Sequence, residues 1–566
     1  MSFFSLRINS LLKSSKGGLY GALFPSGNLR ASLAETKSSF GIFFFVFFLQ
    51  TSSFASVGDS IADTSAITKA GLLIDNRNLP INNEYLLPYD RVINTIHINF
   101  HTSVKPYLGN ELLFIPKFSG VDESYTHFSE NKNKLFFSIH SNLNLTTTYG
   151  SSQSKVLSGN YSGLTFLGSI GGKLSFQLNS LWGYSQFPDY IKTLVNTTHV
   201  VPGIGLGYQQ KNSFYSFQNY SGYVSYSPNK IFNFQAGKDK HFWGDGYRSL
   251  FLSDFAPNYP FLKITTTVWK IKYVNMYAMH KDATTPTQAG SKNKYATFHY
   301  LSWNVCKRFN MSLFESIVWQ GTDSNRVRHF DVNYLNPMIF YRPVEYSLGS
   351  SDNAFLGWSF KWNFFKKQQL YGQVLLDEFL LSEIRKHRGW WANKQSFQLG
   401  IKSYDLFKIK DLDLQLEGNY VRPYTYSHGS VQQNYGHYNY SLAHPLGANF
   451  IEGIAIVNYR HKKFGFRAEV MYVQLGKDSA GKNMGGNIFE SYSLRARDYS
   501  NYTTQGIKTT LVYTDLRVTY DLVKQYHLVL EAGISNRMEN SALSKYNSTF
   551  IYVGLRSNLQ NLYRDF

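Results

Sequence analysis

Over most of the chain, apolar and polar side chains alternate in runs of about ten residues, each followed by a turn. The stretch "GLTFLGSIGGKLSFQLNSLW" shows the pattern clearly. Leu174 and Phe176 occupy one face of a predicted strand, and Ser175 and Gln177 occupy the other. The Gly-Gly pair before this run predicts a two-residue hairpin turn, because glycine adopts positive φ without steric cost.

Tight turns and much longer connections follow each other along the chain, which is typical of outer-membrane barrels with short periplasmic turns and long surface loops. No segment after the N-terminal region reaches 18 consecutive apolar residues, so the sequence predicts no transmembrane helix. A propeller would repeat about every 40 to 50 residues, and no such repeat is found. We therefore predict an all-β fold, a transmembrane antiparallel β-barrel of about 18 strands, with 16 as the alternative. One strand is expected to be missing from the count near residues 263–280. Tight turns are predicted around residues 227–230, 307–308, 366–367, 461–463 and 523–524, and long connections at 183–217, 239–262, 320–353, 380–394, 421–449 and 477–505.

The N-terminus carries a localisation signal. Lys37 precedes an apolar run from Phe40 to Leu49, which the small residues Ser53 and Ala55 close. The run is too short to span a bilayer, for which about 20 residues are needed, and has the flanks of a secretory signal cleaved after Ala55. The sequence thus predicts export to the bacterial outer membrane. The predicted regions are a signal peptide with an N-terminal extension (1–55), a small periplasmic or lumenal segment (56–130) and the barrel with long surface loops (131–566).

Composition and charge narrow the partners. Aromatic residues make up 17% of the chain while the mean hydropathy is −0.29, as expected for strands with one polar face. The formal net charge of +20 favours anionic partners. Since the chain is predicted to be exported, we expect outer-membrane lipid or acidic polysaccharide rather than nucleic acid; the alternative is that the excess is solvated lysine in turns. Cys306 is the single cysteine, so stability must come from elsewhere than an intramolecular disulfide.

The stretch "GKDKHFWGDGYRSLFLSDFAPNYPF", residues 237–261, does not follow the alternation. It begins as the end of a strand and then places charged and aromatic side chains among glycines and prolines. Irregular backbone is tolerated at membrane depth only where it lines a cavity or is buried in protein. We therefore expect this stretch to fold inward, with its charged side chains held by lumenal partners and its aromatic side chains lining or plugging the lumen. Contact with a glycan is the alternative.

Other long connections carry similar side chains, in "FYRPVEY" (340–346) and "HRGWWANKQ" (387–395). Flat aromatic faces beside a few directional hydrogen-bonding groups suit sugars, and arginine suits the carboxylates of acidic sugars. Arg342 and Glu345 can equally form an internal brace, because barrel lumens are commonly lined by such pairs.

Metal and catalytic sites are not predicted. His428, His437 and His444 lie in one loop, but their spacing fits no helical or zinc-ribbon pattern, so a surface rich in Tyr, Asn, Gln and His is favoured over a metal site. Asp377 and Glu378 are adjacent in a predicted strand and would face opposite sides, which argues against paired carboxylate catalysis. No nucleophile elbow is found. The sequence therefore predicts no enzyme, no catalytic residue, no metal and no cofactor.

The segments "GKDKHFWGDGYRSLFLSD", "LNPMIFYRPVEYSLGSSDN", "LYGQVLLDEF" and "GWWANKQSFQLGIK" resemble the Wzi-like capsule-assembly family of outer-membrane proteins. The similarity is greatest to its Bacteroidetes branch, which includes RemB-like gliding-motility proteins, and it extends from about residue 92 to residue 566. It implies an 18-stranded outer-membrane barrel that holds capsular polysaccharide at the cell surface without catalysis. It also implies gliding-machinery proteins as further partners. The long loops differ from the family, so its ligand contacts are not transferred to this chain.

The leading hypothesis is a non-enzymatic outer-membrane barrel that engages surface or capsular polysaccharide, in capsule attachment or in gliding motility and adhesion. The alternative is a substrate-selective or passive porin. The residues predicted to contact polysaccharide are Trp243, Tyr247, Arg248, Arg342, Trp390, Trp391, Lys394, Tyr424 and His437, and those predicted to plug or brace the lumen are Asp239, His241, Asp254 and Glu345.

Overall fold

The computed structural model describes residues 136–151, 155–170, 174–229, 231–282, 292–306, 308–322, 329–340, 352–365, 367–479, 481–523, 528–557 and 565–566. The predicted signal peptide and the predicted segment 56–130 lie outside these residues, as do Arg342, Glu345 and the Gly-Gly turn at 171–172. The two regional predictions for the N-terminus therefore stay predictions.

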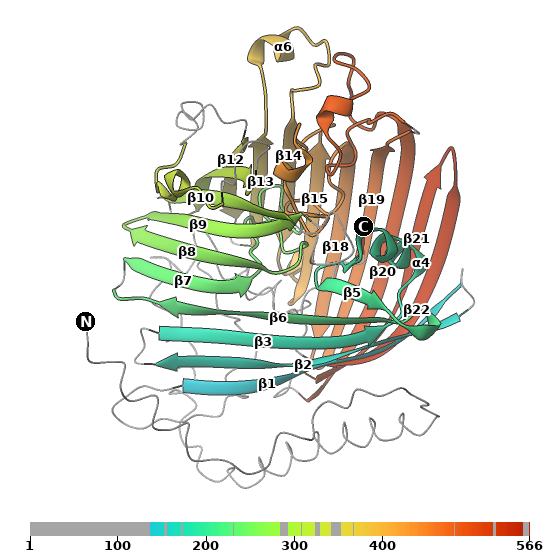
Figure 1. The fold of residues 1–566 in the computed structure, drawn as a ribbon. Coiled ribbons are helices and arrows are strands. Elements are labelled where there is room, and N and C mark those ends of the chain that lie inside the picture. Colours follow the sequence, from blue (N-terminus) through green and yellow to red (C-terminus); the bar gives the residue numbers. More distant parts are fainter. Residues whose placement is uncertain are drawn as a thin grey trace, which may run out of the picture. The chain divides into compact units, whose positions relative to one another are not determined.

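Eighteen antiparallel strands form a closed barrel (Figure 1). Each wall strand pairs with the next one in the wall, and β1 pairs with β22 from Leu143 opposite Ser557 to Gly150 opposite Phe550, which closes the ring. The predicted count of 18 is confirmed. The wall strands are β1 (Phe136–Gly150), β2 (Lys155–Ile170), β3 (Leu174–Ser185), β6 (Tyr215–Tyr226), β7 (Phe232–Asp239), β8 (Tyr259–Val268), β9 (Ile271–Asp282), β10 (Lys292–Cys306), β11 (Phe309–Gln320), β12 (Asn353–Phe365), β13 (Gln368–Leu376), β14 (Gln395–Ser403), β15 (Leu412–Val421), β18 (Phe450–His461), β19 (Phe464–Lys477), β20 (Ile507–Val523), β21 (Leu528–Ser541) and β22 (Lys545–Ser557).

The strand expected near residues 263–280 is found. The single long run in the sequence is two strands, β8 and β9, joined by Trp269 and Lys270 alone. Trp269 has a φ of 53°, so the turn is made without the glycine or asparagine that usually marks such a position. An aromatic residue at the turn position hid the boundary from a search for turn residues.

Short and long connections lie at opposite ends of the barrel. The turns β6–β7, β8–β9, β10–β11, β12–β13, β14–β15, β18–β19 and β20–β21 are all at the end where β1 begins and β22 finishes, which we call the turn end. The connections β3–β6, β7–β8, β11–β12, β13–β14, β15–β18 and β19–β20 are at the other, the loop end. By the usual asymmetry of such barrels the loop end faces outward.

The smaller elements are α4 (Asp189–Thr198), α6 (Leu381–Arg385), β4 (Val200–Val201), β5 (Gly205–Gln209), β16 (Gly436–His437), β17 (Tyr440–Ser441), η5 (Lys211–Ser213), η7 (Val332–Leu335), η8 (Leu406–Lys408), η9 (Val431–Gln433) and η10 (Tyr492–Leu494).

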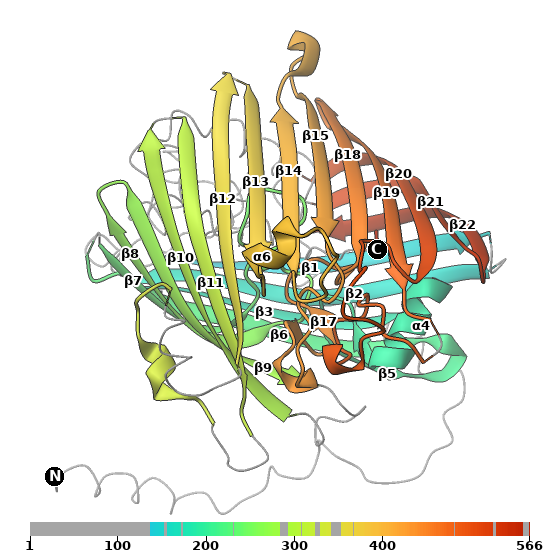
Figure 2. The same cartoon turned by 90° about the horizontal axis from the view of Figure 1, so that it is seen from above.

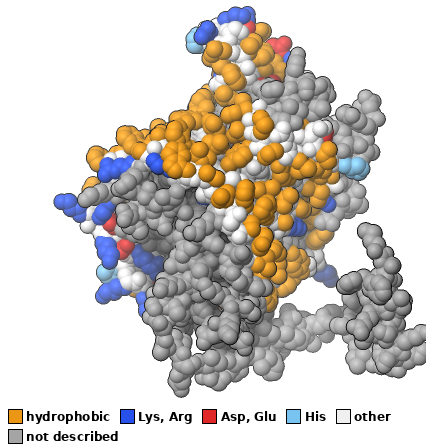
Figure 3. Space-filling view, turned by 90° about the vertical axis from the view of Figure 1, so that its left-hand side faces the viewer, with side chains coloured by type: hydrophobic (Ala, Val, Ile, Leu, Met, Phe, Trp, Pro, Cys, Tyr) orange, Lys and Arg blue, Asp and Glu red, His pale blue; other side chains and the backbone are white. Residues whose placement is uncertain are grey.

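The alternation along the strands separates an apolar outer face from a polar inner face. Leu178 on β3 is 52% exposed, whereas its neighbour Gln177 is 5% exposed. The same holds for Leu399 and Gln398 on β14, at 57% and 4%. Figure 3 shows apolar side chains covering much of the wall on the side in view. A strand with lipid on one side and a packed polar interior on the other needs this pattern. In the described part of the chain, no helix is long and apolar enough to cross a membrane.

The β11–β12 connection packs against the outer face of the wall. The Thr297 hydroxyl donates to the backbone oxygen of Tyr334 (3.1 Å), and the rings of Tyr334 and Trp319 lie 4.5 Å apart. Thr297 neighbours Phe298, which packs into the lumen, so by strand alternation Thr297 points outward. The described part of this connection, residues 329–340, therefore covers the outside of β9 to β11 from the loop end, at Trp319, toward the turn end, at Tyr273.

The interior of the barrel is filled. Viewed from above, the ring of strands surrounds the connection that carries β17 (Figure 2). One hydrophobic cluster extends from wall residues such as Phe298 and Phe314 through Trp243 and Phe251 to Tyr435, all with 0% exposure. Core side chains on irregular segments thus bridge the lumen, which places the candidate sites either within this core or on the loops above it.

Candidate functional site: a filled lumen and an aromatic loop cluster

The β7–β8 connection crosses the inside of the barrel. β7 ends at Asp239, β8 begins at Tyr259, and the 240–258 segment between them is almost entirely buried. Its polar atoms bond to several different wall strands. Gln373 of β13 and Gln398 of β14 donate to the backbone oxygens of Trp243 (3.0 Å) and Arg248 (2.9 Å). Only a segment inside the ring can reach so many walls, and we call residues 240–258 the lumen segment.

Arg248 lies at the centre of a charged network. Its guanidinium contacts the Asp565 carboxylate at 2.9 Å and lies 3.7 Å from a carboxylate oxygen of Glu452, and the Arg248 side chain is 1% exposed. The backbone N–H groups of Tyr247 and Arg248 donate to Glu417 (2.6 and 3.0 Å). Burial raises the pKa of Asp565, but the charge of Arg248 together with hydrogen bonds from Tyr247 and Glu469 holds that pKa below its usual value. The network ties the lumen segment to β15, β18 and the chain's last residues.

Aromatic packing fixes the first half of the lumen segment. The Trp243 ring is fully buried and meets the rings of Phe298, Tyr300 and Phe314 edge-on, at 5.4 to 6.1 Å between centroids. Its indole N–H has no hydrogen-bond partner among the described residues. In this arrangement Trp243 offers no surface to a ligand.

The charged residues before Trp243 are equally enclosed. The Lys240 ammonium donates to the backbone oxygen of Asp254 (3.0 Å), and burial lowers the pKa of Lys240 to about 8. Asp239 accepts from the Lys240 N–H (2.9 Å), and the His241 ring lies beside the Tyr259 hydroxyl (3.3 Å). Asp239, His241 and Asp254 are each at most 3% exposed. These three residues are thus enclosed inside the barrel, while their bracing role stays a prediction and Glu345 lies outside the described residues.

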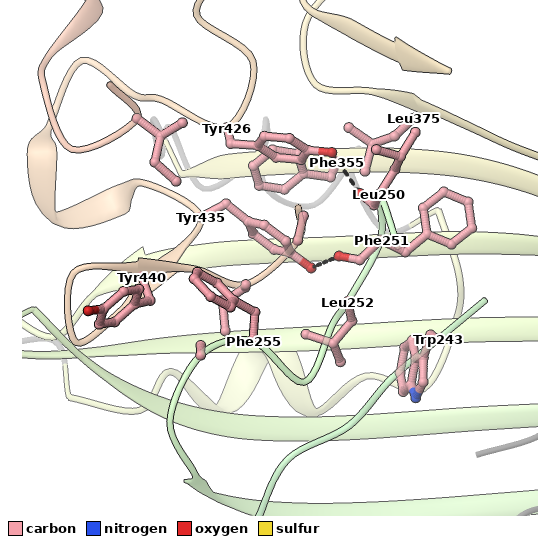
Figure 4. Packing of buried hydrophobic residues seen from close by; sticks show 14 of the residues in the cluster. Trp243, Leu250, Phe251, Leu252, Phe255, Phe355, Leu375, Tyr426, Tyr435 and Tyr440 are labelled. Carbon is pink, nitrogen blue, oxygen red and sulfur yellow. Dashed lines mark hydrogen bonds between the residues drawn. The ribbon is translucent and has the colours of Figure 1, made fainter. Parts of the chain in front are cut away.

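The β15–β18 connection was expected to be a surface loop, and that expectation is wrong. Tyr426 and Tyr435 have 0% exposure and His437 has 1%. The hydroxyls of Tyr426 and Tyr435 donate to the backbone oxygens of Leu250 (2.8 Å) and Phe251 (2.7 Å), as Figure 4 shows. The loop turns inward because its tyrosines satisfy carbonyl groups that the irregular lumen segment cannot pair by itself.

The three histidines of this connection do not converge. His444 contacts Glu452 (2.7 Å), His437 accepts from the Lys281 backbone N–H (2.9 Å) and His428 accepts from the Ser430 N–H (3.1 Å). Burial lowers the pKa of His437 to about 3. Within the described residues no group of three or more His, Cys, Asp or Glu side chains is placed to hold a metal ion.

Two long loops form one unit at the loop end. In the β13–β14 connection, the Trp391 N–H donates to the Asp498 oxygen (2.9 Å), and in the β19–β20 connection the Asn501 N–H donates to the Gly389 oxygen (2.9 Å). Gly389 has a φ of +65°, and a side chain there would lie 2.7 Å from the Asn501 oxygen. Glycine at 389 is therefore required for the two loops to approach this closely.

An aromatic–arginine cluster lies on these paired loops. The rings of Trp390 and Trp391 are 6.2 Å apart, and the Trp391 and Tyr492 rings are 4.7 Å apart. The Arg495 guanidinium lies 4.3 Å from the Trp391 ring centroid. The two tryptophans are half-buried, and Tyr499 is 41% exposed. We define the cluster as Arg388, Trp390, Trp391, Tyr492, Arg495 and Tyr499.

Ion pairs hold the segments next to the aromatic–arginine cluster. The Lys394 ammonium, with 0% exposure, contacts Asp377 (2.9 Å) and Glu378 (3.3 Å). Burial raises the pKa of Asp377 to about 7, although Lys394 opposes the shift. Nearby, the exposed side chains of Lys386 and Arg388 donate to Glu383, which is 7% exposed, and hold the pKa of the Glu383 carboxyl below its usual value. The pair considered for catalysis is thus engaged with Lys394.

The predicted contact residues separate into three groups. Trp390 and Trp391 are half-exposed on the paired loops, and Tyr247 is partly exposed beside the charged network. Trp243, Arg248, Lys394, Tyr424 and His437 are each at most 1% exposed. Arg342 lies outside the described residues. Glycan contact by any of these residues stays a prediction.

The sequence analysis did not find the residues that complete the aromatic–arginine cluster and the Arg248 network. Tyr492, Arg495 and Tyr499 come from a loop about 100 positions away from Trp391, and Asp565 is 317 positions from Arg248. No local pattern brings such residues together. The available signal was the segment "GGNIFESY", which ends in Tyr492.

No protein-family model and no curated protein matches the chain. Among solved structures, it is similar to Wzi of Escherichia coli, described as a carbohydrate-binding β-barrel and an outer-membrane protein involved in group 1 capsule assembly. The TM-score is 0.48 at 13% identity, covering 75% of this chain and 85% of that one. It is also similar to OprD of Pseudomonas aeruginosa (TM-score 0.40, 10% identity, 77% of this chain and 96% of that one) and to OpdK of Pseudomonas aeruginosa with vanillate (TM-score 0.41, 8% identity, 74% and 98%). At such identities these similarities do not decide function.

Proposed function

We propose that this protein is a non-enzymatic outer-membrane barrel that binds polysaccharide at the cell surface, in capsule attachment or in gliding motility and adhesion. The carrying observation is the aromatic–arginine cluster, which two loops tied by backbone hydrogen bonds present at the loop end. Half-buried rings supply flat faces for the apolar side of a sugar, and neighbouring guanidinium groups supply charged donors. The rings and arginines are held before any ligand arrives, which lowers the entropy lost on binding.

The filled lumen supports a binding role over transport. The lumen segment and the β15–β18 connection together place Trp243, Phe251, Tyr426 and Tyr435 in a single buried core. Passage of a solute along the barrel axis would require this core to rearrange. Resemblance of the sequence to the Wzi-like family supports the same function.

The test is binding of the full-length processed protein to purified surface polysaccharide from the producing bacterium. We expect saturable binding that is at least about tenfold weaker in a Trp390→Ala/Trp391→Ala variant, since each ring contributes about 1 kcal/mol. The matched control is Trp269→Ala, which removes an exposed tryptophan at the turn end. Equal losses in both variants, or binding that vanishes with salt alone, would reject the loop cluster as the site.

Conductance measurements distinguish the polysaccharide-binding barrel from the alternative function, a porin. A substrate-selective or passive porin predicts steady single-channel conductance in planar bilayers at neutral pH. A filled lumen predicts little conductance until the lumen segment is displaced. Robust conductance together with no polysaccharide binding would replace the proposed function with transport.

A further inference from the structure

The turn end of the barrel carries a repeated pairing of an aromatic residue with a lysine. Trp269 is followed by Lys270, Phe407 is followed by Lys408, and Phe464 is preceded by Lys463. These rings are strongly exposed, at 63% for Trp269, 81% for Phe407 and 45% for Phe464. Phe365, which is 66% exposed, precedes the β12–β13 turn and is followed in the sequence by two lysines. The same arrangement thus recurs in four separate turns on the circumference.

The backbone at two of these rings is unfavourable. Trp269 and Phe407 have φ values of 53° and 54°, in the left-handed region that glycine or asparagine adopts more easily. An aromatic side chain on an exposed turn gains nothing from water that would offset this cost. It gains if the ring enters the boundary between hydrocarbon and headgroups, where aromatic side chains are enriched on barrels.

Most of the cations that the structure describes in these turns have no carboxylate partner among the described residues. In the described part of the chain, Lys270, Arg308, Lys408, Lys462 and Lys463 form no salt bridge with a carboxylate; Lys367, which pairs with Asp405, is the contrasting case. At the loop end, by contrast, Arg388 is bonded to Glu383 and Arg495 to Asp498. We call the following set the basic turn rim: Lys270, Arg308, Lys367, Lys408, Lys410, Lys462 and Lys463.

We propose that the basic turn rim binds the headgroups of anionic phospholipids in the leaflet on the turn side, with the neighbouring rings seated at the hydrocarbon boundary. A ring and an adjacent lysine reach the two layers of one lipid, the upper acyl chain and the phosphate. Charge complementarity selects anionic over zwitterionic headgroups. The partner is a lipid rather than a soluble polyanion because the exposed rings continue the apolar outer wall. This interaction is independent of the polysaccharide site, which lies at the other end.

The experiment compares retention of phosphatidylglycerol and phosphatidylethanolamine with identical acyl chains, using native mass spectrometry of the full-length processed protein released from mixed vesicles. We expect the wild type to retain phosphatidylglycerol preferentially. A Lys408→Ser/Lys462→Ser/Lys463→Ser variant should lose about fivefold in selectivity for each lysine removed, or about a hundredfold together. These side chains are exposed, and heat-modifiable gel mobility checks that the barrel still folds.

A matched variant removes three exposed cations from the loop end, Lys211→Ser/Arg385→Ser/Lys482→Ser, and should change selectivity less than twofold. A Trp269→Ala/Phe407→Ala variant should weaken retention of both lipids alike, because the rings do not sense headgroup charge. The proposal is overturned if the lysine variant keeps the full preference, or if both sets of charge changes reduce it equally. Selective loss of a soluble polyanion, with lipid retention unchanged, would assign the rim to that class of partner instead.

Discussion

The Arg248 network gives the sharpest test of how the lumen is held. Replacing Arg248 with Met keeps the length of the side chain and removes its charge. Asp565 and Glu452, which are 4% and 2% exposed, would then remain in the core without their shared cation. Tyr247 would still donate to Asp565 (2.8 Å), and His444 would still contact Glu452. The change therefore isolates the charge of Arg248.

The magnitude follows from the geometry. At the 2.9 Å contact with Asp565, two unit charges attract by about 6 kcal/mol at an effective dielectric constant of about 20. Much of this is offset by the cost of burying the charges, and removal of one partner from a buried pair costs about 3 to 5 kcal/mol. In a cycle with Asp565→Asn, the double variant should recover about 1 to 3 kcal/mol of the summed losses.

Hydrogen exchange measures the local free energy within the folded barrel. The amides of Tyr247 and Arg248, which donate to Glu417, report the opening of the lumen segment. A loss of about 3 kcal/mol predicts exchange about a hundredfold faster in Arg248→Met. Arg460→Met is the control, because the Arg460 side chain is 31% exposed in its pair with Asp521 and such pairs contribute at most about 1 kcal/mol. Unchanged exchange in Arg248→Met, or strictly additive losses in the cycle, would refute the network as the brace.

Three further predictions concern the interior and the paired loops. His437 is neutral in the fold because burial lowers its pKa to about 3, so the stability it contributes is complete above about pH 6.5 and is lost as the pH falls toward 3; exchange of β16 should accelerate at about pH 4.5 in the wild type and not in His437→Asn. Tyr435→Phe removes the donor to the Phe251 oxygen and should cost about 1 to 3 kcal/mol, measured as faster exchange in the lumen segment. Gly389→Val should separate the two loops at Asn501 and raise protease cleavage there, while Gly481→Val, with open space around it, should strain its own turn without loosening the pairing.

Each of these has a clear contrary result. An acid-insensitive β16 would mean that His437 has another proton acceptor or is hydrated. Equal exchange in Tyr435→Phe would mean that a water replaces the hydroxyl. Intact loop pairing in Gly389→Val would show that the two loop backbones can shift to accommodate a side chain at position 389, despite the 2.7 Å distance to the Asn501 oxygen.

The wall could be predicted from the sequence because its signal is local. The alternation of Leu178 with Gln177 indicates which face of the strand contacts lipid. The difference between short and long connections indicates which end of the barrel each connection occupies. The β8–β9 turn escaped because Trp269 replaces the usual turn residues. Strand number was therefore recoverable only through the parity expected of a closed barrel.

Part of the interior could be predicted: the irregular stretch 237–261 was expected to fold inward, and residues 240–258 do lie inside the barrel. The inward turn of the β15–β18 connection could not be predicted, because a lumen-filling loop and a surface loop have the same composition. Tyr, Asn, Gln and His in the β15–β18 connection satisfy buried carbonyls as readily as they would meet water. Whether such a loop turns inward depends on whether hydrogen-bond partners, such as the Leu250 carbonyl, are available in the lumen, and these belong to segments far away in sequence. Likewise, Trp390 and Trp391 were found as a pair, but Tyr492 and Arg495, which complete the cluster, were not.

The contact between Arg248 and Asp565 joins residues 317 positions apart. Closing so long a loop costs chain entropy, so the contact is favourable only when the barrel holds both residues near one place. The ring of strands and its filling therefore depend on each other: the lumen segment keeps this partner only while Asp565 is held inside the barrel. Without this contact, the same wall of strands would surround a less tightly held interior.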